Sequence, residues 1–152
     1  MQRTQKDLNK TAWIHPDAID ADRKRWIVDA EGKTLGRLAV EIAKKLTGKA
    51  KPYACDFWDC GDYVVVINTD KLHISGRKQI TKTYYRHTGW KGHLKEITFE
   101  KLMQKDSRQA MMLAVKGMVP KNKMRKPRLK RLKLFTGAEH KYSAMDLHTL
   151  NA

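Results

Sequence analysis

Cysteine and long apolar runs are scarce in this sequence. Among its 152 residues the only cysteines are Cys55 and Cys60, so we expect two reduced thiols near the core rather than a disulfide framework. No stretch approaches the roughly 18 apolar residues that span a bilayer. The first 24 residues hold four acidic residues and no apolar run, which is unlike a secretory signal or an organellar transit peptide. We therefore expect a cytosolic protein that does not enter a membrane.

The usual motifs for a metal, a nucleotide or catalysis are also missing. Zinc sites commonly join two close pairs of ligands, whereas Cys55 and Cys60 form a single C-x4-C pair. The segment 34–37, Thr-Leu-Gly-Arg, fits neither phosphate-loop pattern, so we interpret Gly36 as a close helix-packing contact. We predict no metal, no cofactor, no small-molecule substrate and no enzymatic activity.

Acidic residues are absent from two long stretches. The chain has 32 Lys/Arg against 16 Asp/Glu, a formal net charge of +16. Residues 71–95 hold seven Lys/Arg and residues 107–138 hold ten, with no Asp or Glu in either. The remainder holds 15 basic and 16 acidic residues, so the excess is confined to these two blocks. A solvated basic face is one explanation, but such a local excess favours a nucleic-acid partner.

Apolar patterning predicts a single α/β domain. Strands are expected at 25–29, 63–68, 71–74 and 132–135. A helix is expected from Thr34 to a stop at Gly48, two more at 99–104 and from 106 or 107 to Pro120, and a short one opened by Pro127. Residues 77–95 are expected to form an exposed loop. This order predicts a three-layer α/β/α fold with a small, mostly parallel four-stranded sheet and basic extensions. The expected division is a loosely docked N-terminal arm, 1–24, a domain, 25–145, and an irregular C-terminal tail, 146–152.

The first candidate site is residues 121–133, which we call the basic segment. Eight of its 13 residues are basic. Because an unpaired charge is costly to bury, we expect these side chains to point outward and bind phosphates, while Leu129, Leu132 and Leu134 hold the segment on the body. A localisation signal or simple solubility is the alternative. With Lys116 just before it, the candidate RNA-binding residues here are Lys116, Lys121, Lys123, Arg125, Lys126, Arg128, Lys130, Arg131 and Lys133.

The second candidate site interleaves cations with aromatic residues. Bases that splay out of RNA loops stack on such rings, and Gly89 and Gly92 would allow close backbone approach. Tyr84 or Tyr85 could equally pack beneath the loop, and the sequence does not decide between these roles. The candidates are Arg77, Lys78, Lys82, Tyr84, Tyr85, Arg86, His87, Trp90 and Lys91.

Four blocks of sequence, in order, resemble the thirteenth large-subunit ribosomal protein family in its bacterial form. They are 26–39, 61–68, 84–89 and 114–121, and Gly137 with Glu139-His140 fits the family's ending. The resemblance covers about residues 25–145. It implies a three-layer fold around a parallel sheet, binding of large-subunit (23S-type) rRNA early in assembly, neighbouring ribosomal proteins as partners, and a place in the large subunit of the cytoplasmic ribosome. It also implies no catalysis.

The chain departs from the family's pattern in three places. Asn122 and Arg125 stand where the family has glycines, His93 stands in place of a second glycine after Gly92, and a Gln-x-Pro motif is missing near 146–148. These changes bear on the local backbone path and on individual phosphate contacts. Two rival hypotheses remain, a non-ribosomal RNA-binding regulator and an RNA-processing enzyme that uses His87 or His93.

Overall fold

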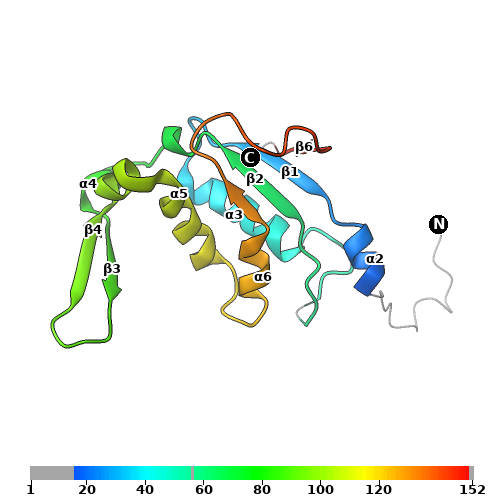
Figure 1. The fold of residues 1–152 in the computed structure, drawn as a ribbon, viewed down its shortest axis with the longest axis horizontal. Coiled ribbons are helices and arrows are strands. Elements are labelled where there is room, and N and C mark those ends of the chain that lie inside the picture. The colour runs from blue at the N-terminus through cyan, green and yellow to red at the C-terminus, as the bar shows by residue number, and fades with distance from the viewer. Residues whose placement is uncertain (1–15, 56, 151–152) are drawn as a thin grey trace.

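A small parallel sheet lies at the centre of the structure (Figure 1). The computed structural model describes residues 16–55 and 57–150, so most of the predicted N-terminal arm, residues 1–15, lies outside the described residues. The sheet contains β1 (Arg25–Asp29), β2 (Tyr63–Ile67), β5 (Leu132–Leu134) and β6 (His148–Thr149) in the order β5-β2-β1-β6. All three neighbouring pairs of strands run parallel. Sheets of this kind are usually covered by helices.

Helix α3 (Leu35–Thr47) and helix α5 (Phe99–Met118) pack together over the sheet. Leu38, Ile42 and Leu46 recur at helical spacing along α3 and are buried, and this helix lies where the sequence predicted one. Thr34 occupies the N-cap position of α3, without a side-chain cap hydrogen bond. Gly48 ends the helix with a left-handed backbone, φ 74°. The predicted α/β fold, with a four-stranded parallel sheet and helices on both sides, is confirmed.

The fourth strand of the sheet is not the predicted one. Residues 71–74 do not form a strand, because the chain turns at Asn68 (φ 57°) into a 3-10 helix, η1 (Thr69–Lys71). Only an isolated bridge joins His73 to Thr34. The fourth strand is instead β6, which lies in the stretch predicted to be irregular. A strand of two residues has too little apolar pattern to be found in a sequence.

The predicted loop 77–95 contains regular structure. Helix α4 (Lys78–Thr81) leads into β3 (Thr83–His87), which pairs antiparallel with β4 (Leu94–Thr98). This hairpin extends away from the body of the protein (Figure 1). Gly89 and Gly92 lie in the connecting turn with φ of 97° and 74°. The conformation of the turn itself therefore favours glycine at both positions, independently of any ligand. The hairpin was not predicted because its side chains are mostly exposed, so no alternation of buried apolar residues marks the two strands in the sequence.

Smaller differences concern the helices. The two helices predicted beyond Thr98 form α5, whose backbone is non-helical at Asp106, where the break was expected. Helix α6 (Arg125–Lys130) contains Pro127 at its third residue rather than its first. Helix α2 (Pro16–Ala21) lies within the predicted arm, and its Ile19 is buried. A Cβ at Gly36 would meet no atom within 4 Å, so the predicted close contact is wrong.

Candidate nucleic-acid interface

The hairpin presents aromatic and basic side chains to solvent. Trp90 is 75% exposed and Tyr85 is 62% exposed, while Arg86, His87 and Lys91 are also exposed. Such large exposed rings beside cations suit stacking on unpaired bases and neutralisation of phosphates.

The two tyrosines of β3 have different surroundings, which resolves the ambiguity of the sequence. Tyr84 is partly buried, with its ring 6.5 Å from that of Phe99, and burial raises the pKa of its hydroxyl. Tyr85 points to solvent, where its hydroxyl accepts a hydrogen bond from Thr83 Oγ1 at 2.8 Å. Tyr84 therefore packs at the base of the hairpin, and Tyr85 remains accessible to a ligand.

The histidines of the hairpin are held by its own turn. His87 Nδ1 accepts a hydrogen bond from the backbone N–H of Gly89 at 3.0 Å, and His93 Nδ1 lies 2.9 Å from the carbonyl oxygen of Lys91. Among residues 16–55 and 57–150, no group of three His, Cys, Asp or Glu side chains is placed to hold a metal ion. Both imidazoles thus have a structural role in shaping the turn.

A cleft of about 670 Å³ lies between the base of the hairpin and the body. The first turn of α3, helix α4, strand β3 and the second half of α5 line it. Its lining includes Arg37, Lys78 and Lys82, and its described walls contain no acidic side chain. Lys82 Nζ lies 5.3 Å from the centre of the Tyr84 ring. Sequence reasoning did not select Arg37, because only the fold brings the start of α3 to the cleft that α4 also lines.

The basic segment divides into outward lysines and inward arginines. The lysines of the segment are exposed, namely Lys121, Lys123, Lys126, Lys130 and Lys133, and so is Lys116 just before it. Arg125 turns back instead, donating hydrogen bonds from Nη2 to the carbonyl oxygens of Lys116 at 2.5 Å and Val119 at 3.1 Å. It thereby satisfies carbonyl groups at the end of α5, and it does so at a position where the sequence departs from the family's glycine.

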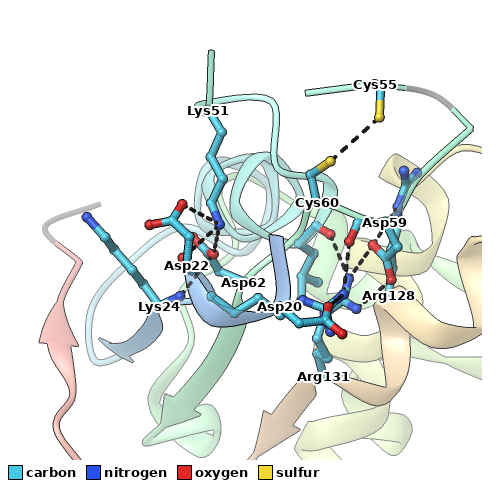
Figure 2. Close-up of polar contacts among 12 residues, drawn as sticks. Asp20, Asp22, Lys24, Lys51, Cys55, Asp59, Cys60, Asp62, Arg128 and Arg131 are labelled. Atoms are coloured by element: carbon cyan, nitrogen blue, oxygen red, sulfur yellow. Dashed lines mark hydrogen bonds and ion pairs between the residues drawn. The ribbon is translucent and has the colours of Figure 1, made fainter. Parts of the chain in front are cut away.

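Arg128 and Arg131 are buried, at 3% and 6% exposure, against Asp59 (Figure 2). Arg131 donates hydrogen bonds from Nη1 and Nη2 to the two carboxylate oxygens of Asp59 at 2.5 and 2.6 Å. Arg128 Nε lies 3.5 Å from Asp59 Oδ1. The expectation that every basic side chain of the segment points outward is wrong for these two, because a carboxylate from a distant loop neutralises them.

The environment of Asp59 keeps it ionised. Burial by itself would raise the pKa of Asp59, but the hydrogen bonds from Arg131 and the positive charges of Arg131, Arg128 and Arg23 hold it below its ordinary value. The neighbouring Gly61 leaves the necessary room, since a Cβ there would lie 2.7 Å from Arg131 Nη2 and 1.9 Å from the Leu46 carbonyl oxygen. The connection 49–62 therefore anchors the basic segment, a role that sequence reasoning missed.

A second buried ion pair fixes the same connection to the sheet. Lys51 Nζ lies 2.7 Å from Asp62 Oδ1 (Figure 2), and both side chains are largely buried. Trp26 Nε1 donates a hydrogen bond to Asp62 Oδ2 at 2.9 Å. Desolvation opposes the charge on Lys51, yet its contacts with Asp62 leave its pKa above the ordinary value. The loop that carries Asp59 is thus held at both ends.

Comparison with known sequences identifies the family. The sequence model of the family described as ribosomal protein L13 matches residues 23–141. The chain belongs to this family. The match spans strands β1, β2 and β5 of the sheet, the hairpin and the basic segment, so the resemblance seen in the four sequence blocks is confirmed. Membership gives the chain a structural rather than an enzymatic role.

Individual relatives agree with the family match. The large ribosomal subunit protein uL13 of Clostridioides difficile is 49% identical over 132 residues, covering 87% of this chain and 92% of that protein. The protein of the same name from Thioalkalivibrio sulfidiphilus is 47% identical over 131 residues, covering 86% and 92%. That from Dichelobacter nodosus is 46% identical over 135 residues, covering 89% and 93%.

In the described part of the chain, no helix combines the length and apolar character needed to cross a bilayer.

Proposed function

We propose that the protein is a structural constituent of the large subunit of the cytoplasmic ribosome, where it binds 23S-type rRNA and supports early subunit assembly. The observation that carries this proposal is the separation of two exposed basic surfaces from a body of balanced charge. The relatives, named as large ribosomal subunit proteins, support the same reading. Its partners are rRNA and neighbouring proteins of the large subunit, with no small-molecule substrate.

The two surfaces are suited to different features of RNA. On the hairpin, Arg86 and Lys91 neutralise phosphates, while Tyr85 and Trp90 stack on bases that are not paired. In the basic segment the exposed lysines contact the phosphate backbone as point charges. The cleft lined by Arg37, Lys78 and Lys82 adds positive charge between the hairpin and the body. One folded domain thereby presents several contacts to the RNA.

Sedimentation of a native lysate on sucrose gradients at low and high salt tests the proposal. Nonspecific binding by surface charge weakens steeply with salt, so we expect the protein to co-migrate with the large subunit even at high salt. A protein found near the top of the gradient at both salt concentrations would contradict a ribosomal role and favour an RNA-binding regulator outside the ribosome. Loss from the subunit at modest salt would also contradict integral membership.

A further inference from the structure

The two cysteines of the chain lie next to each other in the connection 49–62. Cys55 Sγ is 3.7 Å from Cys60 Sγ, and both thiols are free (Figure 2). Cys60 is fully buried, whereas Cys55 is partly exposed. We propose that this pair is an oxidation site, at which a hydroperoxide forms an intramolecular disulfide that thiol reductants reopen.

The geometry suits a disulfide that forms by a local movement. An S–S bond measures about 2.05 Å. Because the two sulfur atoms are 3.7 Å apart, they must approach each other by only about 1.6 Å. Cys60 is the fixed partner, because its backbone packs against Gly48, where a Cβ would come within 2.7 Å of the Cys60 carbonyl oxygen. Cys55 is taken as the partner that moves, since its side chain is only partly buried whereas that of Cys60 is fully buried.

The unequal burial assigns each thiol a step. The thiolate of solvent-reachable Cys55 attacks one oxygen of the hydroperoxide; the O–O bond breaks, leaving a sulfenic acid and releasing water or an alcohol once the second oxygen takes up a proton. The Cys60 sulfur then attacks the Cys55 sulfur; the S–S bond forms, the S–O bond breaks, and the Cys60 proton leaves with the hydroxyl group as water. The two sulfurs lose two electrons and the hydroperoxide gains them. Burial raises the pKa of Cys60, so near neutral pH its sulfur carries the proton that leaves in this second step.

The site is joined directly to the anchor of the basic segment. Asp59, the residue before Cys60, holds Arg128 and Arg131. A disulfide would close a small ring around Asp59 and remove conformational freedom from the loop in the unfolded chain. Oxidation is therefore expected to stabilise the folded loop that carries Asp59.

The test uses the full-length protein, reduced, treated with a small excess of hydrogen peroxide, denatured and alkylated. Intact mass and peptide mapping should show most of the protein two hydrogens lighter, unalkylated and linked between Cys55 and Cys60, and dithiothreitol should reverse this. Wild-type protein that yields Cys55 sulfinic acid with Cys60 still alkylatable would overturn the proposal, as would disulfides formed only between molecules.

Two single variants test the two steps separately. If one of them fails to fold, the other still tests its own step. In Cys60→Ser, Cys55 should accumulate as a sulfenic acid that dimedone traps, because the resolving thiol is gone. In Cys55→Ser, buried Cys60 should remain a thiol after the same treatment. Rapid oxidation of Cys60 in Cys55→Ser would contradict the assigned order of attack.

Discussion

Asp59 faces two guanidinium groups that burial has removed from water, those of Arg128 and Arg131. The two guanidinium groups share the single negative charge of this carboxylate, and the Nε atoms of both arginines are buried without a hydrogen-bond partner among the described residues. Buried charges are tolerated only when paired, and removal of one partner leaves an uncompensated charge. At the scale of single residues, these arginines hold the basic segment to the fold rather than reach outward to a ligand.

Replacing the carboxylate tests this role. Asp59→Asn should lower the free energy of unfolding by about 3–5 kcal/mol, because both buried guanidinium groups lose the carboxylate charge that they share. Urea denaturation followed by circular dichroism measures the change. The control is Glu31→Gln, which removes an exposed ion pair to Lys71 (2.8 Å) and should cost at most about 1 kcal/mol. Equal effects of the two substitutions would show that Asp59 is not an anchor.

Acid should weaken the same contact. The pKa of Asp59 in the folded protein lies below its ordinary value, which is about 3.9 in unfolded chains. As pH falls through this range the unfolded state takes up its proton first, so the stability contributed by Asp59 declines from about pH 4 and is lost below the folded pKa. Urea midpoints of wild type and Asp59→Asn should therefore converge as the pH decreases. A gap that stays constant down to acid unfolding would contradict the depressed pKa.

At the scale of elements, the strength of the apolar pattern decided what the sequence could predict. Strands β1 and β2 and helix α3 were found at nearly their observed bounds, because their buried residues recur at strand or helix spacing. The hairpin β3–β4 was missed because its side chains are mostly exposed, and β6 because it has only two residues.

The candidate site was predictable in location but not in detail. Two acid-free blocks predicted where the exposed cations gather, and the structure places most of them on the surface. The sequence could not show that Arg131 and Arg128 face inward, because their partner Asp59 lies 72 positions from Arg131. Pairing across such a distance follows from the sheet, which sets β2 beside β5.

The hairpin is predicted to bind RNA as an independent element. The double variant Arg86→Glu/Lys91→Glu should lower affinity for in vitro transcribed large-subunit rRNA at least roughly tenfold, because two phosphate contacts become repulsive. Its stability should stay within about 0.5 kcal/mol, as both side chains are exposed. Filter binding at fixed salt and urea denaturation supply the two measurements.

The matched control for the hairpin is Lys24→Glu/Lys49→Glu, which makes the same change of charge at exposed positions outside both basic blocks. It should weaken binding much less. If the two double variants bind rRNA equally weakly, the effect comes from net charge alone, and the hairpin is not a specific contact.

The two faces of the basic segment should separate by mutation. Lys126→Glu/Lys130→Glu should reduce rRNA affinity with little loss of stability, since both side chains are exposed. Arg131→Ala should instead lower the free energy of unfolding by about 3–5 kcal/mol, because it leaves buried Asp59 poorly paired. The same binding and urea experiments compare them. Unchanged binding by the lysine variant would remove the segment from the interface.

At the scale of the whole molecule, the excess positive charge lies on particular segments and not on the body of the fold. Outside residues 71–95 and 107–138 the chain holds nearly equal numbers of acidic and basic residues, and these two blocks, which include most of the hairpin and all of the basic segment, carry the excess. The hairpin projects from one end of the molecule, and α6 lies on the body (Figure 1). Two basic surfaces at a fixed separation can hold RNA segments in a defined relative position, which a disordered polycation cannot do.

Ultraviolet crosslinking of native large subunits, followed by mass spectrometry of the crosslinked peptides, tests this account most directly. We predict rRNA crosslinks within residues 77–95, at Tyr85 and Trp90 above all, and at the exposed lysines of 116–133, with none at Arg128 or Arg131. Crosslinks confined to the neutral body, or absent from both basic surfaces, would contradict it.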